Sequence, residues 1–287
     1  MSHIGAASMA DFVRNPDRLS TADFQRVASF IMSATGIKLP PTKKTLVEGR
    51  LSRRARRLGI ASLADYVAAV FDGGDADDES IHMIDALTTN KTDFFREPSH
   101  FHFLTRTALP ELASRRSVAK IWSAACSIGA EPYTLAMVLS DFAEEAPGWR
   151  FSILASDIST KALAKAARAV YSEEMVEPVP LPMRQKYLLR SRDSSKGEVR
   201  MTPHIRALVR FARVNLVEER YPVDRDMDVI LCRNLLIYFD KATQETVIRR
   251  LCSYLKPGGY LILGHTDSIM NMPLPLEALG QSIYRRK

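Results

Sequence analysis

The sequence predicts an α/β protein in which a small helical N-terminal domain precedes a mostly parallel sheet. From residue 120 onward, short apolar segments alternate with segments of helical periodicity, a pattern typical of βαβ units. Before that point the periodicity is helical only. The chain has 287 residues, of which 46% are hydrophobic and 25% are charged. This length and composition are those of a globular protein that can bury a full core.

Residues 10–82 are expected to form the helical domain. Ser20 can cap a helix that ends at Gly36, and "SLADYVAAVF" has helical spacing. The acidic, glycine-containing stretch 72–80 is expected to be a flexible break. A further helix is expected over residues 80–90, which leads into the second domain.

A basic segment, residues 43–60, carries much of the net charge of +7. Read as a helix, the segment has an apolar stripe made of Val47, Leu51, Ala55 and Leu58. The other side carries Arg50, Arg53, Arg54 and Arg57. Such a face is either simply solvated or a docking surface for an acidic partner, and the charge run alone does not separate the two.

Residues 83–287 are expected to form the second domain. The expected strands are residues 120–125, 151–157, 209–216, 227–234 and 260–265. The expected helices are residues 131–146, 161–171 and 241–259, the last stopped by Pro257 and Gly258. Residues 184–207 read instead as an inserted antiparallel β-subdomain, either a hairpin or three strands.

Several classes of protein are excluded by composition. No apolar run approaches the roughly 18 residues of a membrane span, and the start lacks a signal-peptide pattern. The three cysteines are far apart and odd in number, so neither a disulfide framework nor a metal site is expected, and a reducing cytoplasm fits. Only His100 and His102 lie close together among the six histidines, and this spacing points them to different faces of a helix.

Polar residues follow the predicted strands where a parallel sheet binds its ligands, outside the carboxyl ends. They are residues 123–131 after the first strand, Asp157 after the second, Asn215 after the third, and Arg233 and Asn234 after the fourth. Asp157 lies about one helix and one strand after Gly129, as does the acid that binds ribose hydroxyls in nucleoside-binding folds. The site is therefore expected to bind a nucleoside.

The turn after the first strand, "ACSIGAEP", has the single glycine Gly129 followed by Glu131. A carboxylate in this place would repel a pyrophosphate and attract an ammonium or sulfonium group. The pattern therefore favours S-adenosylmethionine, which carries both cations and no phosphate. Nicotinamide and flavin cofactors remain the alternatives at this stage.

Five segments together resemble the chemotaxis receptor glutamate methyltransferases, the CheR family. They are "TTNKTDFFREPSHF", "WSAACSIGAEPYT", "ASDIS", "VNL" and "CRNLLIYFD", in that order over about 150 residues. The resemblance implies a Rossmann-like methyltransferase domain that uses S-adenosylmethionine and releases S-adenosylhomocysteine. It also implies that glutamate side chains on cytoplasmic helices of chemoreceptors become γ-methyl esters.

The resemblance also implies roles for individual residues. Asn90, Thr92 and Arg96 match positions that line the cofactor, Glu131 and Asp157 match acids on its methionine and ribose parts, and Tyr238 matches a tyrosine near the sulfonium. Asn215, Leu216, Arg233 and Asn234 match contacts to the adenosine and the rear wall. Arg96 and Tyr238 are the expected catalytic residues. One departure is Ala130, because the family usually has a glutamate there.

The implied chemistry needs few special side chains. A glutamate side chain is ionised at neutral pH, so it can accept a methyl group without a general base. Phe94 and Phe95 are expected to pack in the core rather than contact substrate, and Cys126 and Cys232 are expected to be inert.

Two other functions stay open at the level of sequence. A nucleic-acid methyltransferase would suit the basic helix, but the stretch "NLLIY" lacks the Asn/Asp-Pro-Pro-aromatic turn of enzymes that methylate base amino groups. A cofactor-binding adaptor without turnover is the second. We expect a cytoplasmic monomer that docks chemoreceptor helices through Arg50, Arg53, Arg54 and Arg57, binds no nucleic acid and does not insert into membranes. Binding of a receptor tail by the β-subdomain is doubtful, because "RSRDSSKGEV" lacks a glycine-rich turn.

Overall fold

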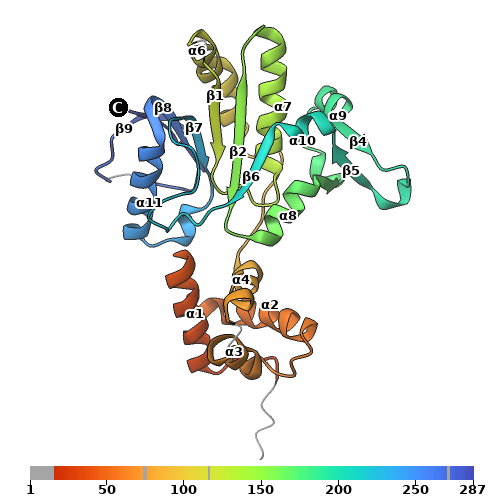
Figure 1. The fold of residues 1–287 in the computed structure, drawn as a ribbon, viewed down its shortest axis with the longest axis vertical. Coiled ribbons are helices and arrows are strands. Elements are labelled where there is room, and N and C mark those ends of the chain that lie inside the picture. Colours follow the sequence, from red (N-terminus) through yellow and green to blue (C-terminus); the bar gives the residue numbers. More distant parts are fainter. Residues whose placement is uncertain (1–15, 74–75, 116, 270–271) are drawn as a thin grey trace, which may run out of the picture. The chain divides into compact units, whose positions relative to one another are not determined.

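The computed structural model describes residues 16–73, 76–115, 117–269 and 272–287 (Figure 1). The chain forms two compact units: the described residues up to Phe30 with Leu39–Leu87, and Ile31–Lys38 with Thr88–Lys287. The boundary expected between residues 82 and 83 falls inside a helix that continues to Leu87, so the helical unit ends later than predicted, and Ile31–Lys38 belongs to the second unit. No described helix combines the length and hydrophobicity needed to cross a bilayer.

The helical unit is built from the helices predicted by periodicity, with caps where the sequence places them. Its elements are the first ten residues of α1 (Thr21–Thr35), the 3-10 turn η1 (Pro41–Lys43), α2 (Lys44–Arg57), α3 (Leu63–Asp72) and α4 (Ala76–Leu87), whereas α1 from Ile31 onward belongs to the second unit. Ser20 accepts a hydrogen bond from the Asp23 backbone N–H, as an N-cap residue does. The helix ends before Gly36 as predicted, with Gly36 at φ +72°.

The acidic stretch 72–80 is not the break that the sequence predicts. Helix α4 already begins at Ala76, and only residues 74–75 of the stretch lie outside the described residues. Alanine followed by acidic residues suits the first turn of a helix, where negative side chains are stabilised by the helix dipole.

Helix α2 buries the predicted stripe only in part. Val47, Leu51 and Ala55 are buried, but Leu58 lies beyond the last helical residue and is 45% exposed, so its assignment to the stripe is wrong.

The four arginines of α2 that were expected to face a partner divide into two pairs. Arg54 forms a forked ion pair with Glu79 of α4, with Nε–Oε1 and Nη2–Oε2 distances of 2.9 and 2.6 Å. Arg50 donates to the backbone carbonyl of Leu87 at 2.8 Å. Arg53 and Arg57 are exposed. The expectation of four cations offered to a partner is therefore too broad, because Arg50 and Arg54 hold α2 against α4.

The second unit contains a seven-stranded sheet in the order β6-β2-β1-β7-β8-β10-β9. Its strands are β1 (Ala119–Ser123), β2 (Phe151–Asp157), β6 (Val209–Arg213), β7 (Met227–Cys232), β8 (Leu255–Leu263), β9 (Leu276–Gly280) and β10 (Ile283–Arg286). The first five pair in parallel, whereas β10 is antiparallel to both β8 and β9. All five strands predicted from the sequence are present, and the β9–β10 hairpin is an addition.

Helices cover both faces of this sheet. Successive residues of β1 point to opposite sides: Ile121 packs in the cluster that contains residues of α7 (Ala130–Glu145), and Trp122 in the cluster with α11 (Lys241–Tyr254). This arrangement is typical of doubly covered parallel sheets. Helix α11 ends at Tyr254 rather than at residue 259, because Leu255–Leu263 forms β8.

Other elements of the second unit lie outside the predicted set or differ from it. Before β1 run α5 (Ser99–Phe103), the π-helix η2 (Leu104–Ala108) and α6 (Leu109–Ser114). The predicted helix 161–171 is α8 (Thr160–Arg168), and its last residues instead begin β3 (Val170–Ser172). The turn η5 (Leu236–Tyr238) follows β7.

The small second sheet has three strands, which resolves the choice between hairpin and three strands. Its order is β3-β5-β4, all antiparallel, with β4 (Leu188–Arg190) and β5 (Glu198–Met201) inside the predicted insertion and β3 before it. The accompanying elements are η3 (Glu174–Val176), α9 (Leu181–Tyr187), η4 (Ser194–Lys196) and α10 (Pro203–Ala207).

The division among the α2 arginines is testable by hydrogen exchange. Replacing Arg54 with alanine removes a forked pair whose two side chains are only 19% exposed, and leaves Glu79 with the Tyr66 hydroxyl as its remaining donor. We expect amides of α2 and α4 to exchange about tenfold faster or more, because charged hydrogen bonds contribute about 1.5–3 kcal/mol.

Arg53→Ala is the matched control. Among the residues that the structure describes, its Nε hydrogen-bonds only the Gly49 carbonyl of the same helix, at 3.4 Å, so exchange in α2 and α4 should stay at the wild-type rate. Equal rates in both variants, measured by mass spectrometry, would contradict the structural role of Arg54.

Candidate functional site

The order in which successive strands join the parallel sheet reverses at β1. The chain runs from β1 to β2 and β6 on one side, then returns to add β7 and β8 on the other (Figure 1). Ligands of open parallel sheets bind outside the carboxyl ends of strands at such a reversal. The strands concerned end at Ser123, Asp157 and Cys232, so this edge is the candidate site.

The turn between β1 and α7 requires its single glycine. Gly129 has φ +95°, and a Cβ atom there would lie 2.8 Å from the Tyr171 hydroxyl and 2.9 Å from the Ala166 Cβ. A side chain would therefore force the turn away from α8 and β3. The glycine serves this close approach rather than a phosphate.

Asp157 anchors the loops around the site. Its Oδ2 accepts from the Ser127 backbone N–H at 2.8 Å, and its Oδ1 accepts from the Ser159 N–H at 2.9 Å. The Ser127 hydroxyl in turn donates to the Asn90 carbonyl at 2.8 Å. The Asp157 carboxylate thus joins the end of β2 to the β1–α7 turn, and the Ser127 hydroxyl extends this link to the segment preceding α5.

A narrow hollow next to Asp157 has apolar walls and polar ends. Its lining residues are Thr35, Ile37, Ala124, Ala125, Asp157, Ile158, Val214, Asn215, Leu216, Leu235 and Phe239. Apolar side chains beside a carboxylate suit a nucleoside, which presents an apolar base face and ribose hydroxyls. The Asn215 side chain already donates to the Ala34 carbonyl at 2.7 Å, so it fixes one wall of the hollow.

A buried ion cluster lies at the end of β7. The Arg233 side chain is 2% exposed and donates to Glu131 at 2.9 Å and to Glu97 at 3.0 Å. It also donates to the Arg96 carbonyl. The other oxygen of Glu131 accepts from the Ser123 hydroxyl at 2.7 Å. We call Glu97, Glu131 and Arg233 the ion cluster.

The ion cluster changes the role expected for Glu131, whose carboxylate was predicted to attract a cationic ligand directly. Glu131 is not an unpaired carboxylate, because both of its oxygens are engaged within the protein. Two carboxylates nevertheless face one guanidinium, so the cluster retains one net negative charge. Burial makes that charge more effective toward a nearby cation than it would be in water.

The pKa values of two acids around the cluster shift in opposite directions. Burial opposes ionisation of Glu97, but hydrogen bonds from Asn234 and Arg233 outweigh it and lower the Glu97 pKa below its usual value. Burial raises the pKa of Asp267, which accepts from the backbone N–H groups of Asn234 at 2.6 Å and Gly264 at 3.0 Å. Asp267 thereby holds Asn234, whose φ is +57°, in an unusual backbone conformation.

The loop before α5 has a strained backbone around Arg96. Its neighbours Phe95 and Glu97 both have positive φ, +52° and +55°, which is uncommon for such residues and clusters at functional sites. The Arg96 side chain is half-buried and makes no hydrogen bond to another described residue. This unusual backbone conformation determines the direction in which the side chains of the loop point.

The structure brings most predicted site residues to one edge. Thr92 and Tyr238 are half-buried, Tyr238 on the turn η5, where its carbonyl accepts from the Lys38 N–H at 3.1 Å. The arginines of α2 belong to the helical unit. Sequence reasoning missed Glu97 and Asp267, since neither follows a strand directly; the signal available for Glu97 was its place beside Arg96 in "TTNKTDFFREPSHF".

Core assignments near the site are confirmed. Phe94 is 1% exposed and stacks edge-on against Tyr171 at 5.0 Å between ring centroids. Cys126 and Cys232 are buried, and burial raises the pKa of both thiols well above the usual value, so they stay protonated and inert.

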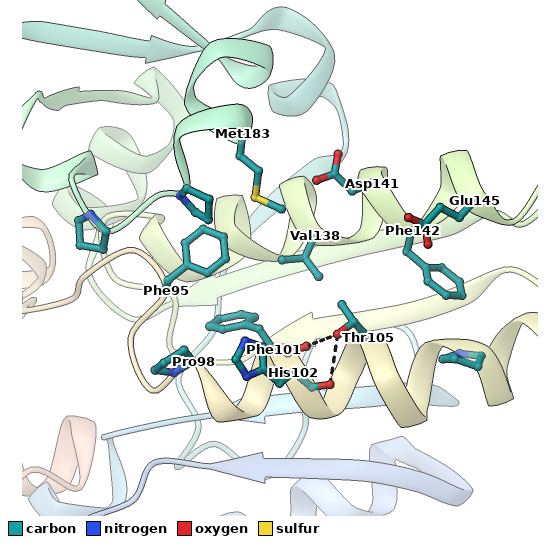
Figure 2. A pocket seen from close by; sticks show the side chains of 13 residues that line it. Phe95, Pro98, Phe101, His102, Thr105, Val138, Asp141, Phe142, Glu145 and Met183 are labelled. Atoms are coloured by element: carbon teal, nitrogen blue, oxygen red, sulfur yellow. Dashed lines mark hydrogen bonds between the residues drawn. The ribbon is translucent and has the colours of Figure 1, made fainter.

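A separate cavity of about 780 Å³ lies between α5, η2, α7 and α9, lined by Phe95, Phe101, Val138 and Met183 among others (Figure 2). None of the predicted cofactor residues lines it. Phe95 is half-buried: it faces this cavity and also packs against the core cluster, as expected.

Comparison with known proteins gives matches over almost the whole chain. Residues 90–285 match the family model described as "CheR methyltransferase, SAM binding domain", and residues 22–88 match "CheR methyltransferase, all-alpha domain". A "Chemotaxis protein methyltransferase" of Salmonella typhimurium is 38% identical over 93% of this chain and 90% of its own length. The protein of that name from Borreliella burgdorferi is 35% identical over 86% and 88%. Residues 90–285 include every predicted cofactor residue.

The ion cluster predicts a strong effect of removing its cation. Arg233→Met leaves two buried carboxylates without their guanidinium, and breaking a buried pair in this way typically costs about 3–5 kcal/mol. We expect a large drop in the thermal stability of the second unit, measured by calorimetry of the full chain.

Arg210→Met is the control, since Arg210 and its partner Asp224 are 67% and 65% exposed at their side chains. Its effect should be close to zero. A wild-type melting profile for Arg233→Met would show that the cluster does not stabilise the site.

Proposed function

We propose that this chain, which belongs to the CheR methyltransferase family, methylates glutamate side chains on chemoreceptor helices. The chain is an S-adenosylmethionine-dependent methyltransferase of chemotaxis. Formation of the γ-glutamyl methyl ester is the part that we propose. The observation that carries it is the excess negative charge of the buried ion cluster at the strand ends, which suits a positively charged methyl donor.

The residues at the strand ends fit the cofactor. Asp157 is held by two backbone amides beside a hollow with apolar walls, which suits the ribose and base of an adenosine. The net negative charge of the ion cluster suits a sulfonium and an ammonium group. S-adenosylmethionine supplies a methyl group attached to a positively charged sulfur. We propose Asn90, Thr92, Glu131, Asn215, Leu216, Arg233 and Asn234 as further residues around it, as the family match implies.

An acceptor glutamate makes few chemical demands on the protein. Its carboxylate is ionised at neutral pH and needs no proton removed before it reacts. The protein must instead align the carboxylate and exclude water, both of which favour a reaction in which opposite charges are neutralised.

Arg96 and Tyr238 are proposed as the residues that contact the reacting groups. Arg96 lies between two residues of positive φ, and its guanidinium has no hydrogen-bond partner among the described residues, so it can take a carboxylate in a forked contact. Such a contact also stabilises the carboxylate before reaction, so we assign Arg96 to positioning of the substrate.

The exposed arginines of α2 are the proposed docking residues. Arg53 and Arg57 retain this role, whereas Arg50 and Arg54 are engaged inside the helical unit. Arg56, also exposed, joins the proposed surface. A row of cations suits helices that carry several glutamates.

The two alternative functions are less well supported. The relatives are named as chemotaxis methyltransferases rather than nucleic-acid enzymes, and the stretch after β7 is "NLLIY". An adaptor without turnover would not need Arg96 and Tyr238 at this edge.

A radiolabel assay tests the reaction. With labelled S-adenosylmethionine and receptor cytoplasmic fragments, we expect label on receptor protein that mild alkali releases as methanol, because carboxylate esters are base-labile. Alkali-stable label, or label on nucleic acid instead, would contradict glutamate esterification. Cofactor binding without any transfer would indicate the adaptor.

A kinetic comparison tests the role of Arg96. Arg96→Ala should lower kcat by about tenfold or more while changing the cofactor Kd much less, because the lost contact is to the acceptor carboxylate. Arg106→Ala, at an exposed arginine on η2, should leave both constants near wild type. An equal loss in kcat and cofactor affinity would refute this division.

Charge reversal tests docking. Arg53→Glu with Arg57→Glu should reduce receptor methylation several-fold, more at low than at high salt, with cofactor binding unchanged. Arg190→Glu with Arg192→Glu changes the net charge equally at exposed positions of the β-subdomain. A loss in the second pair only would place docking on the β-subdomain.

A further inference from the structure

A histidine pair lies beside the ion cluster. His100 on α5 is completely buried, and its ring packs against that of His265 with centroids 4.9 Å apart. His265 follows β8 and is exposed. One ligand atom from each of Glu97, His100 and His265 lies within 4.8 Å of the other two. Local sequence spacing gives no sign of this group, because His265 is far from the others in the chain.

The buried histidine presents an unpartnered nitrogen to this group. Its Nε2 lies 2.9 Å from the Gln281 carbonyl oxygen, which only accepts, so Nε2 carries a proton. In the neutral ring Nδ1 is then a bare lone pair, and it has no hydrogen-bond partner in the described part of the chain. It faces the Glu97 Oε2 at 3.5 Å, which is also an acceptor. Two acceptor atoms that face each other away from solvent repel one another, and a cation bound between them would satisfy both.

We propose that Glu97, His100 and His265 bind a divalent transition-metal ion of the Zn²⁺ class. For Zn²⁺ with nitrogen and oxygen ligands at about 2.0–2.1 Å, tetrahedral geometry places neighbouring ligand atoms about 3.3–3.4 Å apart. The observed 3.5 Å between His100 Nδ1 and Glu97 Oε2 already has this spacing. The exposed His265 provides the third ligand from the solvent side, which gives the ion an entry path.

The chemistry of the ligands selects among metals. Two imidazoles and one carboxylate suit Zn²⁺, Ni²⁺, Cu²⁺ or Co²⁺, whereas Mg²⁺ and Ca²⁺ prefer oxygen ligands alone. Gln281 holds the second nitrogen of His100, as the outer partners of metal-binding histidines do.

The metal shares Glu97 with Arg233. Oε2 of Glu97 accepts from Arg233 at 3.0 Å, and Oε1 accepts from Asn234 at 3.1 Å. The guanidinium would repel the ion in part, but Arg233 keeps Glu131 and the Arg96 carbonyl as other partners, and the ion cluster has one net negative charge to offset the ion. Metal binding and the loop that carries Arg96 are therefore linked through Glu97.

Calorimetric titration of the full chain with Zn²⁺ under reducing conditions tests the site. We expect one ion per chain, with affinity reduced at least tenfold in His265→Ala and unchanged in His102→Ala. His102 is an exposed histidine on the same α5 helix and outside the group. Excess Mg²⁺ should not displace Zn²⁺.

Cobalt provides a spectroscopic second readout. Co²⁺ bound by the wild-type chain should give the intense visible bands of a four-coordinate site, and His265→Gln should lose them while its circular dichroism stays that of the wild type. Equal Zn²⁺ affinity in His265→Ala and wild type, or only weak six-coordinate Co²⁺ bands in the wild type, would overturn the proposal.

Discussion

The buried guanidinium of Arg233 is the interaction on which the rest of the site depends. It comes from the end of β7 and binds one carboxylate from α7 and one from the loop before α5, so three segments distant in sequence meet at a single charge. A cation with 2% exposure is tolerable only because it has these partners. The two acids in turn leave the cluster negative, which suits a cofactor that carries positive charge.

A second set of contacts fixes the backbone around this cluster. Asp157 and Asp267 accept hydrogen bonds mainly from backbone N–H groups. Asp157 thereby fixes the turn after β1, and Asp267 fixes the backbone of Asn234, the residue after Arg233. Positive φ values at Phe95, Glu97, Ser127 and Asn234 occur where these loops converge. The surrounding packing and hydrogen bonds offset the energetic cost of this backbone strain, so the loops are held in position for binding.

The helical unit distributes its arginines between two tasks. Arg54 and Arg50 hold α2 to α4, while Arg53, Arg56 and Arg57 stay exposed for a partner. The same basic segment therefore contributes to both stability and the proposed docking. Substitution of Arg50 or Arg54 should lower stability, whereas substitution of an exposed arginine should weaken docking.

The sequence by itself determined the order of strands and helices, the position of the glycine turn and the acid at the end of β2, because these follow from local periodicity and from the rule that parallel strands end at one edge. It also carried the family motifs. Only the tertiary structure decided which charges meet: that Arg233 engages Glu131, that Glu97 joins them, that Arg54 belongs to Glu79, and that His265 lies beside His100. Such pairings join residues far apart in the chain, and their geometry is set by how the sheet and its loops pack, which no local pattern encodes.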